Sequence, residues 1–176
     1  MGSARVLSSK PLVILMKRVF LFLLFCISTS AQAECSGGAE ELFQCSFDSG
    51  YQLNICLQEG AVTYMYGADG KMPELILSRR VEDVTMTPWP GIGRTFWEEI
   101  NVRNQGVTYT ITQWADRNDL NTLPGGAVDV VRNGEHLVRL DCVEGTVTGD
   151  FYPLFEAKQN FGQSWCHDAQ AWDACG

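Results

Sequence analysis

The chain has 176 residues, 45% of them hydrophobic, and a net charge of −8 at pH 7, which suits one globular domain with its own core. Its 21 acidic residues outnumber 13 basic ones, which argues against a nucleic-acid-binding or anionic-membrane surface. If the protein binds another macromolecule, charge favours a cationic partner.

Residues 1–33 have the organisation of a leader with a secretory signal peptide. Met16-Lys17-Arg18 gives a positive start, residues 19–27 are apolar, and Ala31-Gln32-Ala33 has the small side chains that signal peptidase requires. Translation is expected to start at Met16, because a signal peptide begins close to its charged residues. The alternative is a retained anchor, but the apolar run is short for a membrane span. We therefore expect a periplasmic or secreted protein without stable membrane insertion.

Cleavage after Ala33 removes four basic residues and no acid, so the net charge changes from −8 to −12 in the remaining chain. Two regions follow. Residues 34–150 are expected to form a β-barrel or sandwich domain, and residues 151–176 a helical, disulfide-closed tail packed on the same domain.

Residues 34–150 show the two-residue alternation of β-strands, broken by short turns. Asn133-Gly134 is the strongest hairpin signal in the chain. Eight or nine strands at this spacing predict an all-β fold, an antiparallel barrel or sandwich with one short C-terminal helix. The strands are expected at 42–47, 53–57, 61–66, 74–78, 81–87, 96–103, 107–112, 127–131 and 137–142. The helix is expected at 151–161, with Pro153 in its first turn and Gly162 after its end.

Six cysteines remain after Cys26 leaves with the leader, and an even number in an exported chain favours three disulfides. Cys45 and Cys142 alternate in phase with apolar neighbours, so both point inward and can join the first strand to the last. Cys56 is out of phase and is expected to meet an outer segment such as Cys35. Cys166–Cys175 is the local remainder. The spacing does not resemble a metal site, so no metal or cofactor is expected.

Residues 88–97 form the most specialised stretch of the chain. Pro88 and Pro90 end a strand, whereas Gly91 and Gly93 permit sharp turning. The stretch therefore predicts a shaped loop between two strands. Its candidate binding residues, by the chemistry of protein interfaces, are Trp89, Ile92 and Arg94. Trp97 is assigned instead to the core. The alternative for Trp89 is that it plugs the core or the end of the barrel, and the alternative for Arg94 is an ion pair with a surface acid.

Catalytic residues are not evident. His167-Asp168 could supply a base and its orienting acid, but adjacent residues rarely face each other. Glu98-Glu99 could be a carboxylate pair, yet neighbours on a strand point to opposite faces. The chain is therefore interpreted as a non-enzyme.

A set of short motifs lies between residues 43 and 142: Cys45-Ser46-Phe47, Cys56, Tyr64, Pro73-Glu74-Leu75, Trp89-Pro90-Gly91-Ile92-Gly93-Arg94, Trp97-Glu98-Glu99, Gly125-Gly126 and Leu140-Asp141-Cys142. Together they resemble a family of uncharacterised exported bacterial proteins, for which no activity is implied. The layout is also loosely similar to the periplasmic c-type lysozyme inhibitors, which are small exported β-barrels that insert a loop into the lysozyme cleft. Their Ser-Gly-x-x-Tyr signature does not occur here.

Three functions are consistent with these observations. The first is an exported, non-enzymatic binding or inhibitor module of the bacterial envelope that acts through the loop at 89–97, with a basic protein such as a lysozyme as its partner. The second is a structural or scaffolding envelope protein. The third is a hydrolase with an unrecognised site.

We predict that the exported protein begins at Glu34, because Ala31 and Ala33 provide the small residues of a cleavage site. N-terminal sequencing of protein recovered outside the cytoplasm tests this. A sequence starting at Met1 or Met16 would show that the leader is retained.

Overall fold

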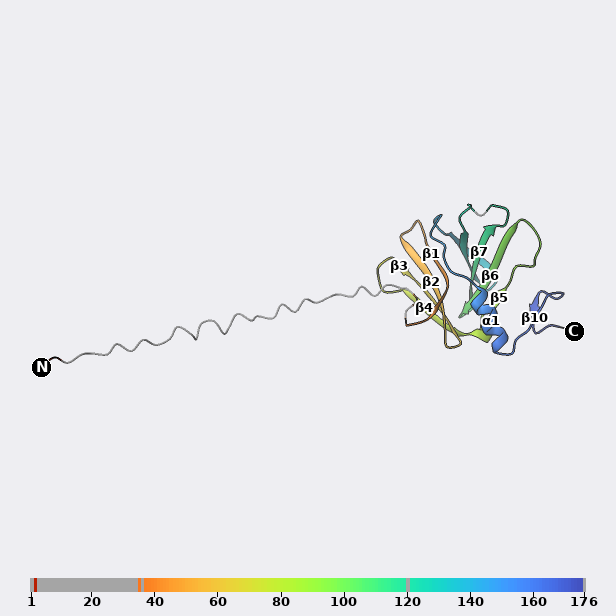
Figure 1. Ribbon diagram of the computed structural model, residues 1–176, viewed down its shortest axis with the longest axis horizontal. Helices are drawn as coiled ribbons and strands as arrows, with labels where there is room; N and C mark the ends of the chain where they lie inside the picture. Colours follow the sequence, from red (N-terminus) through yellow and green to blue (C-terminus); the bar gives the residue numbers. More distant parts are fainter. Residues whose placement is uncertain (1, 3–34, 36, 120, 176) are drawn as a thin grey trace.

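A computed structural model describes residues 2, 35, 37–119 and 121–175 (Figure 1). The predicted signal peptide and its cleavage site at Ala33 lie outside the described residues. Among the residues that are described, no helix has the length and apolarity of a membrane span. The strands form two main antiparallel sheets and one small hairpin.

The first sheet contains four strands in chain order, joined by tight turns. Its core face carries alternating apolar side chains such as Leu53, Ile55 and Tyr64, all buried. The second strand is buried on both faces, because Gln52, Asn54 and Cys56 on its outer face are buried as well. The strands are β1 (Glu40–Ser46), β2 (Tyr51–Gln58), β3 (Ala61–Ala68) and β4 (Leu75–Arg80).

A 3-10 turn, η1 (Val81–Asp83), leads from the first sheet to the second. The sequence pattern predicts a single strand at 81–87, but only the end of that stretch is a strand. The amide of Val81 donates to the carbonyl of Gly60 at 2.9 Å, which holds the turn against the first sheet. Val81 and Val84 are both buried, so this stretch carries core residues, as a strand would, although it forms a turn.

The second sheet contains five strands in chain order. Asn133 and Gly134 connect its last two strands, with φ values of 49° and 87°, the left-handed conformation that such a tight hairpin turn requires. The predicted hairpin is therefore confirmed. The strands are β5 (Thr85–Thr87), β6 (Thr95–Asn104), β7 (Val107–Asp116), β8 (Gly125–Arg132) and β9 (Glu135–Asp141).

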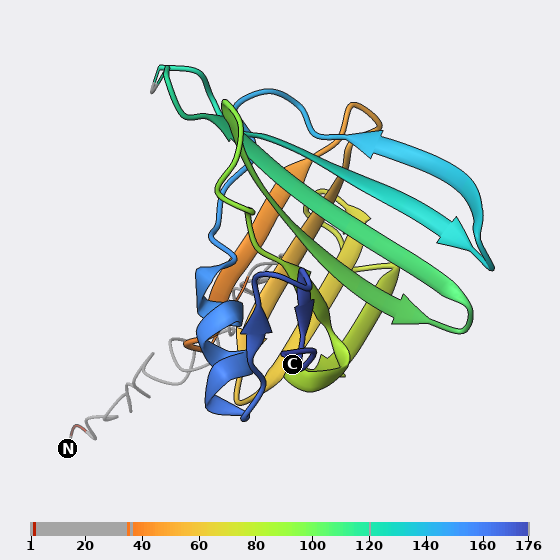
Figure 2. The same cartoon turned by 90° about the vertical axis from the view of Figure 1, so that its right-hand side faces the viewer.

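The two main sheets lie across one another in Figure 2, and one hydrophobic cluster fills the space between them. Leu53 and Tyr64 come from the first sheet, Ile100 and Ile111 from the second, and Phe151 from the segment that follows. The predicted antiparallel, mostly β fold with a C-terminal helix is confirmed. Over the described part of the chain, however, the strands form separate sheets and no closed barrel.

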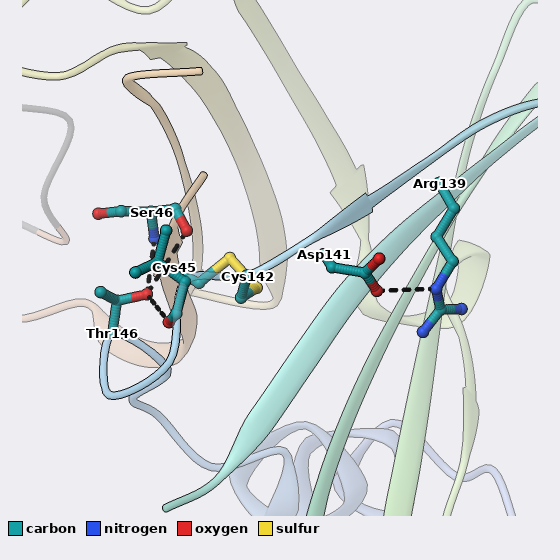
Figure 3. The surroundings of a disulfide bond; sticks show 7 residues. Cys45, Ser46, Arg139, Asp141, Cys142 and Thr146 are labelled. Atoms are coloured by element: carbon teal, nitrogen blue, oxygen red, sulfur yellow. Dashed lines mark hydrogen bonds and ion pairs between the residues drawn. A yellow bond between two sulfur atoms is a disulfide. The ribbon is translucent and has the colours of Figure 1, made fainter. Parts of the chain in front are cut away.

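The first strand is joined to the segment that follows β9. Gln44 and Thr148 exchange two backbone hydrogen bonds of 3.0 Å each, and the amide of Val143 donates to the carbonyl of Ser46 at 2.8 Å. The Cys45–Cys142 disulfide crosses the same junction. Figure 3 shows the hydroxyl of Thr146 beside it, accepting from the Ser46 amide at 3.1 Å. The predicted connection between the ends of the β domain is confirmed.

The other two disulfides also match the expected pairs. Cys35–Cys56 ties the N-terminal segment to the outer face of β2, and Cys166–Cys175 closes the tail over a separation of nine residues. Three disulfides indicate that the protein folds outside the reducing cytoplasm.

The tail packs on the β domain through helix α1 (Tyr152–Asn160) and the hairpin of β10 (Trp165–Cys166) and β11 (Ala171–Trp172). Lys158 is 1% exposed, and its ammonium group donates to the carbonyls of Val81 at 3.1 Å and Val84 at 2.6 Å. Burial lowers the pKa of this amine. The indole of Trp172 lies 4.9 Å away and donates to the carbonyl of Met86 at 2.7 Å.

Replacing both Cys45 and Cys142 by alanine should destabilise the protein by about 3–5 kcal/mol, because that disulfide closes a long loop in the unfolded chain. The Cys166–Cys175 disulfide closes a far shorter loop, so the matched double alanine variant at these two positions should lose about 2–3 kcal/mol of stability. Denaturant unfolding of the two variants measures the difference. An equal or larger loss in the tail variant would contradict the importance of the β1 junction.

Candidate functional site

Residues 88–94 form an exposed loop between β5 and β6, as the proline and glycine pattern predicts. Gly91 and Gly93 have φ values of 84° and 98°, a conformation that side chains disfavour. The loop is fastened to the end of β7. The amide of Arg117 donates to the Arg94 carbonyl at 3.1 Å, and its guanidinium donates to the Gly93 carbonyl at 3.0 Å. These bonds define the loop's shape before any partner arrives.

Trp89 is half-buried inside this loop. Its indole N–H donates to the carbonyl of Ile92 at 3.2 Å, and the guanidinium carbon of Arg117 lies 4.3 Å from its ring centroid. The ring of Phe96 packs nearby, with the two ring centroids 5.6 Å apart. A cation over an indole face is attracted to the ring. Trp89 therefore braces the loop, and only part of its surface is open to a partner.

Arg94 forms an ion pair with Asp116, the last residue of β7. The shortest distance, from Nη2 to Oδ2, is 2.6 Å, and Nε donates to the same oxygen at 2.8 Å. The hydrogen bonds from Arg94 hold the pKa of the Asp116 carboxyl below its ordinary value. Arg94 therefore pairs with a surface acid, which was the alternative to a free binding residue.

Ile92 is the exposed apolar member of the three candidate residues. Its side chain is 78% exposed at the tip of the loop, as expected for a contact residue and unusual for isoleucine. The neighbouring loop, which includes Arg117, also exposes an apolar side chain, Leu123 at 53%. Two adjacent loops at this end of the molecule therefore present apolar groups to solvent.

Trp97 is not in the core, so that assignment is wrong. Strand β6 begins at Thr95, and its even-numbered residues, from Glu98 to Val102, are the buried ones. Trp97 lies half-buried on the outer face, directly opposite Trp114 of β7. An aromatic pair in this position stabilises the sheet from outside.

Glu98 takes the inward position instead. Its side chain is 8% exposed, and its Oε2 accepts a hydrogen bond of 3.2 Å from Gln113. Burial raises the pKa of this carboxyl, the hydrogen bond lowers it, and the charge of Asp150 raises it further. Glu99 points to the other face, as predicted, so the two neighbours share no site. Sequence reasoning missed Glu98, although its phase with Ile100 and Val102 could have indicated it.

A cleft of about 210 Å³ lies between the end of β7 and the segment before α1. Phe96 lies at its boundary with the loop, and Gln113 connects it to the buried carboxylate. Its remaining walls come from Trp114 and Ala115 of β7, from Pro124 and from the chain segment before α1. The lining residues are Phe96, Gln113, Trp114, Ala115, Pro124, Gly149 and Asp150.

Within the described residues, histidine, cysteine, aspartate and glutamate form no group of three that could hold a metal ion. Comparisons with protein-family models, curated proteins and solved structures find no match to this chain. The candidate site is therefore defined by its own geometry.

We predict that Glu98→Gln stabilises the protein at pH 7 by about 1 kcal/mol, or a melting temperature about 3 °C higher. The folded state raises the pKa of Glu98 above its ordinary value of 4.5, so wild-type stability falls as the pH rises through the raised pKa. Glutamine removes the charge and still accepts from Gln113. Denaturant unfolding between pH 4 and 7 measures the difference.

Glu99→Gln is the matched control, since that side chain lies on the outer face. The gain from Glu98→Gln should disappear at pH 4 and below, where the wild-type carboxyl is protonated. A variant that is less stable than wild type at pH 7 would contradict the desolvation argument.

Proposed function

We propose that this protein is an exported, non-enzymatic binding or inhibitor module of the bacterial envelope, located in the periplasm or secreted. Its contact surface is the loop rim, which we define as Trp89, Ile92, Arg94, Arg117 and Leu123. In this proposal the two main sheets act as the layers of a rigid sandwich, or the walls of a barrel, that holds the rim.

The observation that carries the proposal is the exposure of Ile92, 78%, at the tip of a loop that the chain has already ordered. Arg117 binds the loop backbone and covers Trp89, and Arg94 is tied to Asp116. A loop fixed in advance loses less conformational entropy on binding. An apolar side chain on such a support favours recognition over a purely scaffolding role.

Charge supports a basic partner. The chain carries −8 overall, and the part expected after cleavage carries four fewer positive charges. Long-range attraction would raise the rate at which a cationic protein meets this surface. A c-type lysozyme is the first candidate, because it is basic and belongs to the same extracellular environment.

Ile92→Ser should weaken binding to c-type lysozyme by at least about 30-fold, equivalent to a hot-spot loss of about 2 kcal/mol. The folded state should be unaffected, because the side chain makes few contacts. Affinity is measured by calorimetry or biolayer interferometry with residues 34–176, and stability by thermal unfolding.

Ile76→Ser is the matched control. Ile76 is also an exposed isoleucine, at 56%, but it lies on β4 of the other sheet. Equal effects of the two changes, or wild-type protein that neither binds nor inhibits lysozyme, would contradict the proposal for this partner. Trp89→Ala is less informative, since Trp89 braces the loop and its loss should also alter loop structure.

A further inference from the structure

A second cleft, which we call the tail cleft, lies between the β10–β11 hairpin and β5 (Figure 2). Lys158 of α1 lies between the two sides, since its ammonium group donates to the Val84 carbonyl and faces the ring of Trp172 at 4.9 Å. The tail cleft measures about 300 Å³, at the small end of the range for ligand sites in proteins. The residues of its two sides indicate which kind of ligand it suits.

Two tryptophans give the tail cleft an aromatic wall. Trp165 and Trp172 are directly opposite one another in the β10–β11 pairing, so their side chains lie on the same face of the hairpin. Their ring centroids are 5.5 Å apart, and the ring planes meet at 63°, an edge-to-face contact. Both side chains are half-buried, so part of each indole stays open beside the cleft.

The hairpin that carries this wall is firmly held. The amide of Asp173 donates to the Ser164 carbonyl at 2.7 Å, and the Asp173 carboxylate accepts from the Ser164 amide at 2.8 Å. The Cys166–Cys175 disulfide closes the same segment, and the indole N–H of Trp172 is bonded to β5. A wall that is fixed in advance loses little conformational entropy when a ligand binds.

The other lining groups are polar and mostly uncharged. Thr85 and Thr87 are two residues apart on β5 and therefore share one face, and Gln163 and Gln170 come from the tail. The amide nitrogen of Gln163 donates to Asp173 at 3.3 Å, but its Oε1 is buried and has no hydrogen-bond partner within the described residues. Buried acceptors ordinarily have a partner. A donor brought by a ligand would supply one here.

The charges of the lining exclude several kinds of ligand. Its two charged residues, Glu82 and Lys158, have opposite signs. An anion would meet Glu82 and the carbonyls that already hold the Lys158 ammonium group, and a cation would meet Lys158 itself. A wholly apolar ligand would leave the threonines and glutamines without partners. The lining therefore suits a neutral molecule with one apolar face and an edge of hydrogen-bonding groups.

We propose that the tail cleft binds one residue of a neutral oligosaccharide. A pyranose ring has an apolar face of C–H groups, which the electron-rich face of an indole attracts, and hydroxyl groups around its edge. The ring lies against Trp165, and its hydroxyls are directed toward Thr87 and Gln163. This site goes beyond the binding function proposed above and does not depend on it, since the loop rim contributes no residue to the lining.

A longer sugar chain has a continuation on α1. The ring of Phe155 lies 5.2 Å from that of Trp172, and the ring of Tyr152 lies 6.3 Å from that of Phe155, centroid to centroid. Tyr152 is 56% exposed. A row of aromatic rings therefore leads from the tail cleft along the helix, so tetrasaccharides are better probes than single sugars.

The test titrates the exported protein with cellotetraose, with the tetramer of N-acetylglucosamine, and with decaproline as a peptide probe of aromatic surfaces. NMR follows the indole N–H signals of Trp165 and Trp172, with that of Trp97 as an internal reference. Trp165→Ala removes the wall, and Trp97→Ala, on the outer face of β6, is its matched control. Thr87→Val removes one hydroxyl with little change of shape, and Thr108→Val on β7 is the control for that change.

At least one of the two sugars should shift the Trp165 and Trp172 signals saturably and leave Trp97 unchanged. Trp165→Ala should weaken binding at least about tenfold and Thr87→Val about fivefold, while both controls bind like wild type. A preference for one sugar shows whether the ligand is a plain or an N-acetylated glycan.

Three results would overturn the proposal: no saturable shift with either sugar, binding of decaproline alone, or equal losses in Trp165→Ala and Trp97→Ala. Thermal unfolding shows whether Trp165→Ala also loosens the tail. If it does, Thr87→Val decides, because that change leaves the hairpin intact, and wild-type affinity in this variant would then contradict the site.

Discussion

The pairing of β1 with the segment after β9 is the contact on which the rest of the structure depends. Gln44 and Thr148 bond reciprocally, and the Cys45–Cys142 disulfide lies beside them. Without this junction, each main sheet would meet the other only through side chains and through η1. The junction also fixes residues 149–150, which form one wall of the cleft next to the loop rim. Structural support and candidate site are thus parts of one arrangement.

The loop rim illustrates how an exposed loop can be made rigid without burial. Arg117 contributes three contacts: its amide donates to the Arg94 carbonyl, its guanidinium donates to the Gly93 carbonyl, and the same group covers the indole of Trp89. Asp116 holds Arg94. Asp116 is the last residue of β7 and Arg117 follows it, so the central strand of the five-stranded sheet sets the position of the loop. Ion pairs this exposed contribute little to overall stability. Their effect is local, since they select one loop shape among many.

Sequence patterns were informative wherever a local rule decides the structure. Alternation identified the strands, Asn133-Gly134 identified a hairpin, and the phase of Cys45 and Cys142 identified a disulfide across the domain. These features depend on a few neighbouring residues or on the side to which a strand residue points. The same alternation, applied to Glu98, would have placed a carboxylate inside.

The remaining features depend on contacts between distant segments. Trp97 was assigned to the core, but β6 buries its even-numbered residues from Glu98 to Val102, so Trp97 lies on the outer face. The partner of Arg94 lies 22 residues away, and several acids were available to it. The sequence also did not predict that β4 and β5 belong to different sheets, because only the short turn η1 separates them along the chain.

Lys158 has a consequence for the order in which this chain can fold. Its ammonium group donates to the carbonyls of Val81 and Val84, which precede it by 77 and 74 residues. Gln44 of β1 likewise finds its backbone partner only in the distant Thr148. In a chain that emerges N-terminus first, both sets of backbone groups stay hydrogen-bonded to water until the last quarter has appeared. Completion of the native structure is therefore delayed until the C-terminal residues are free to pack, and an incomplete chain lacks both of these long-range contacts.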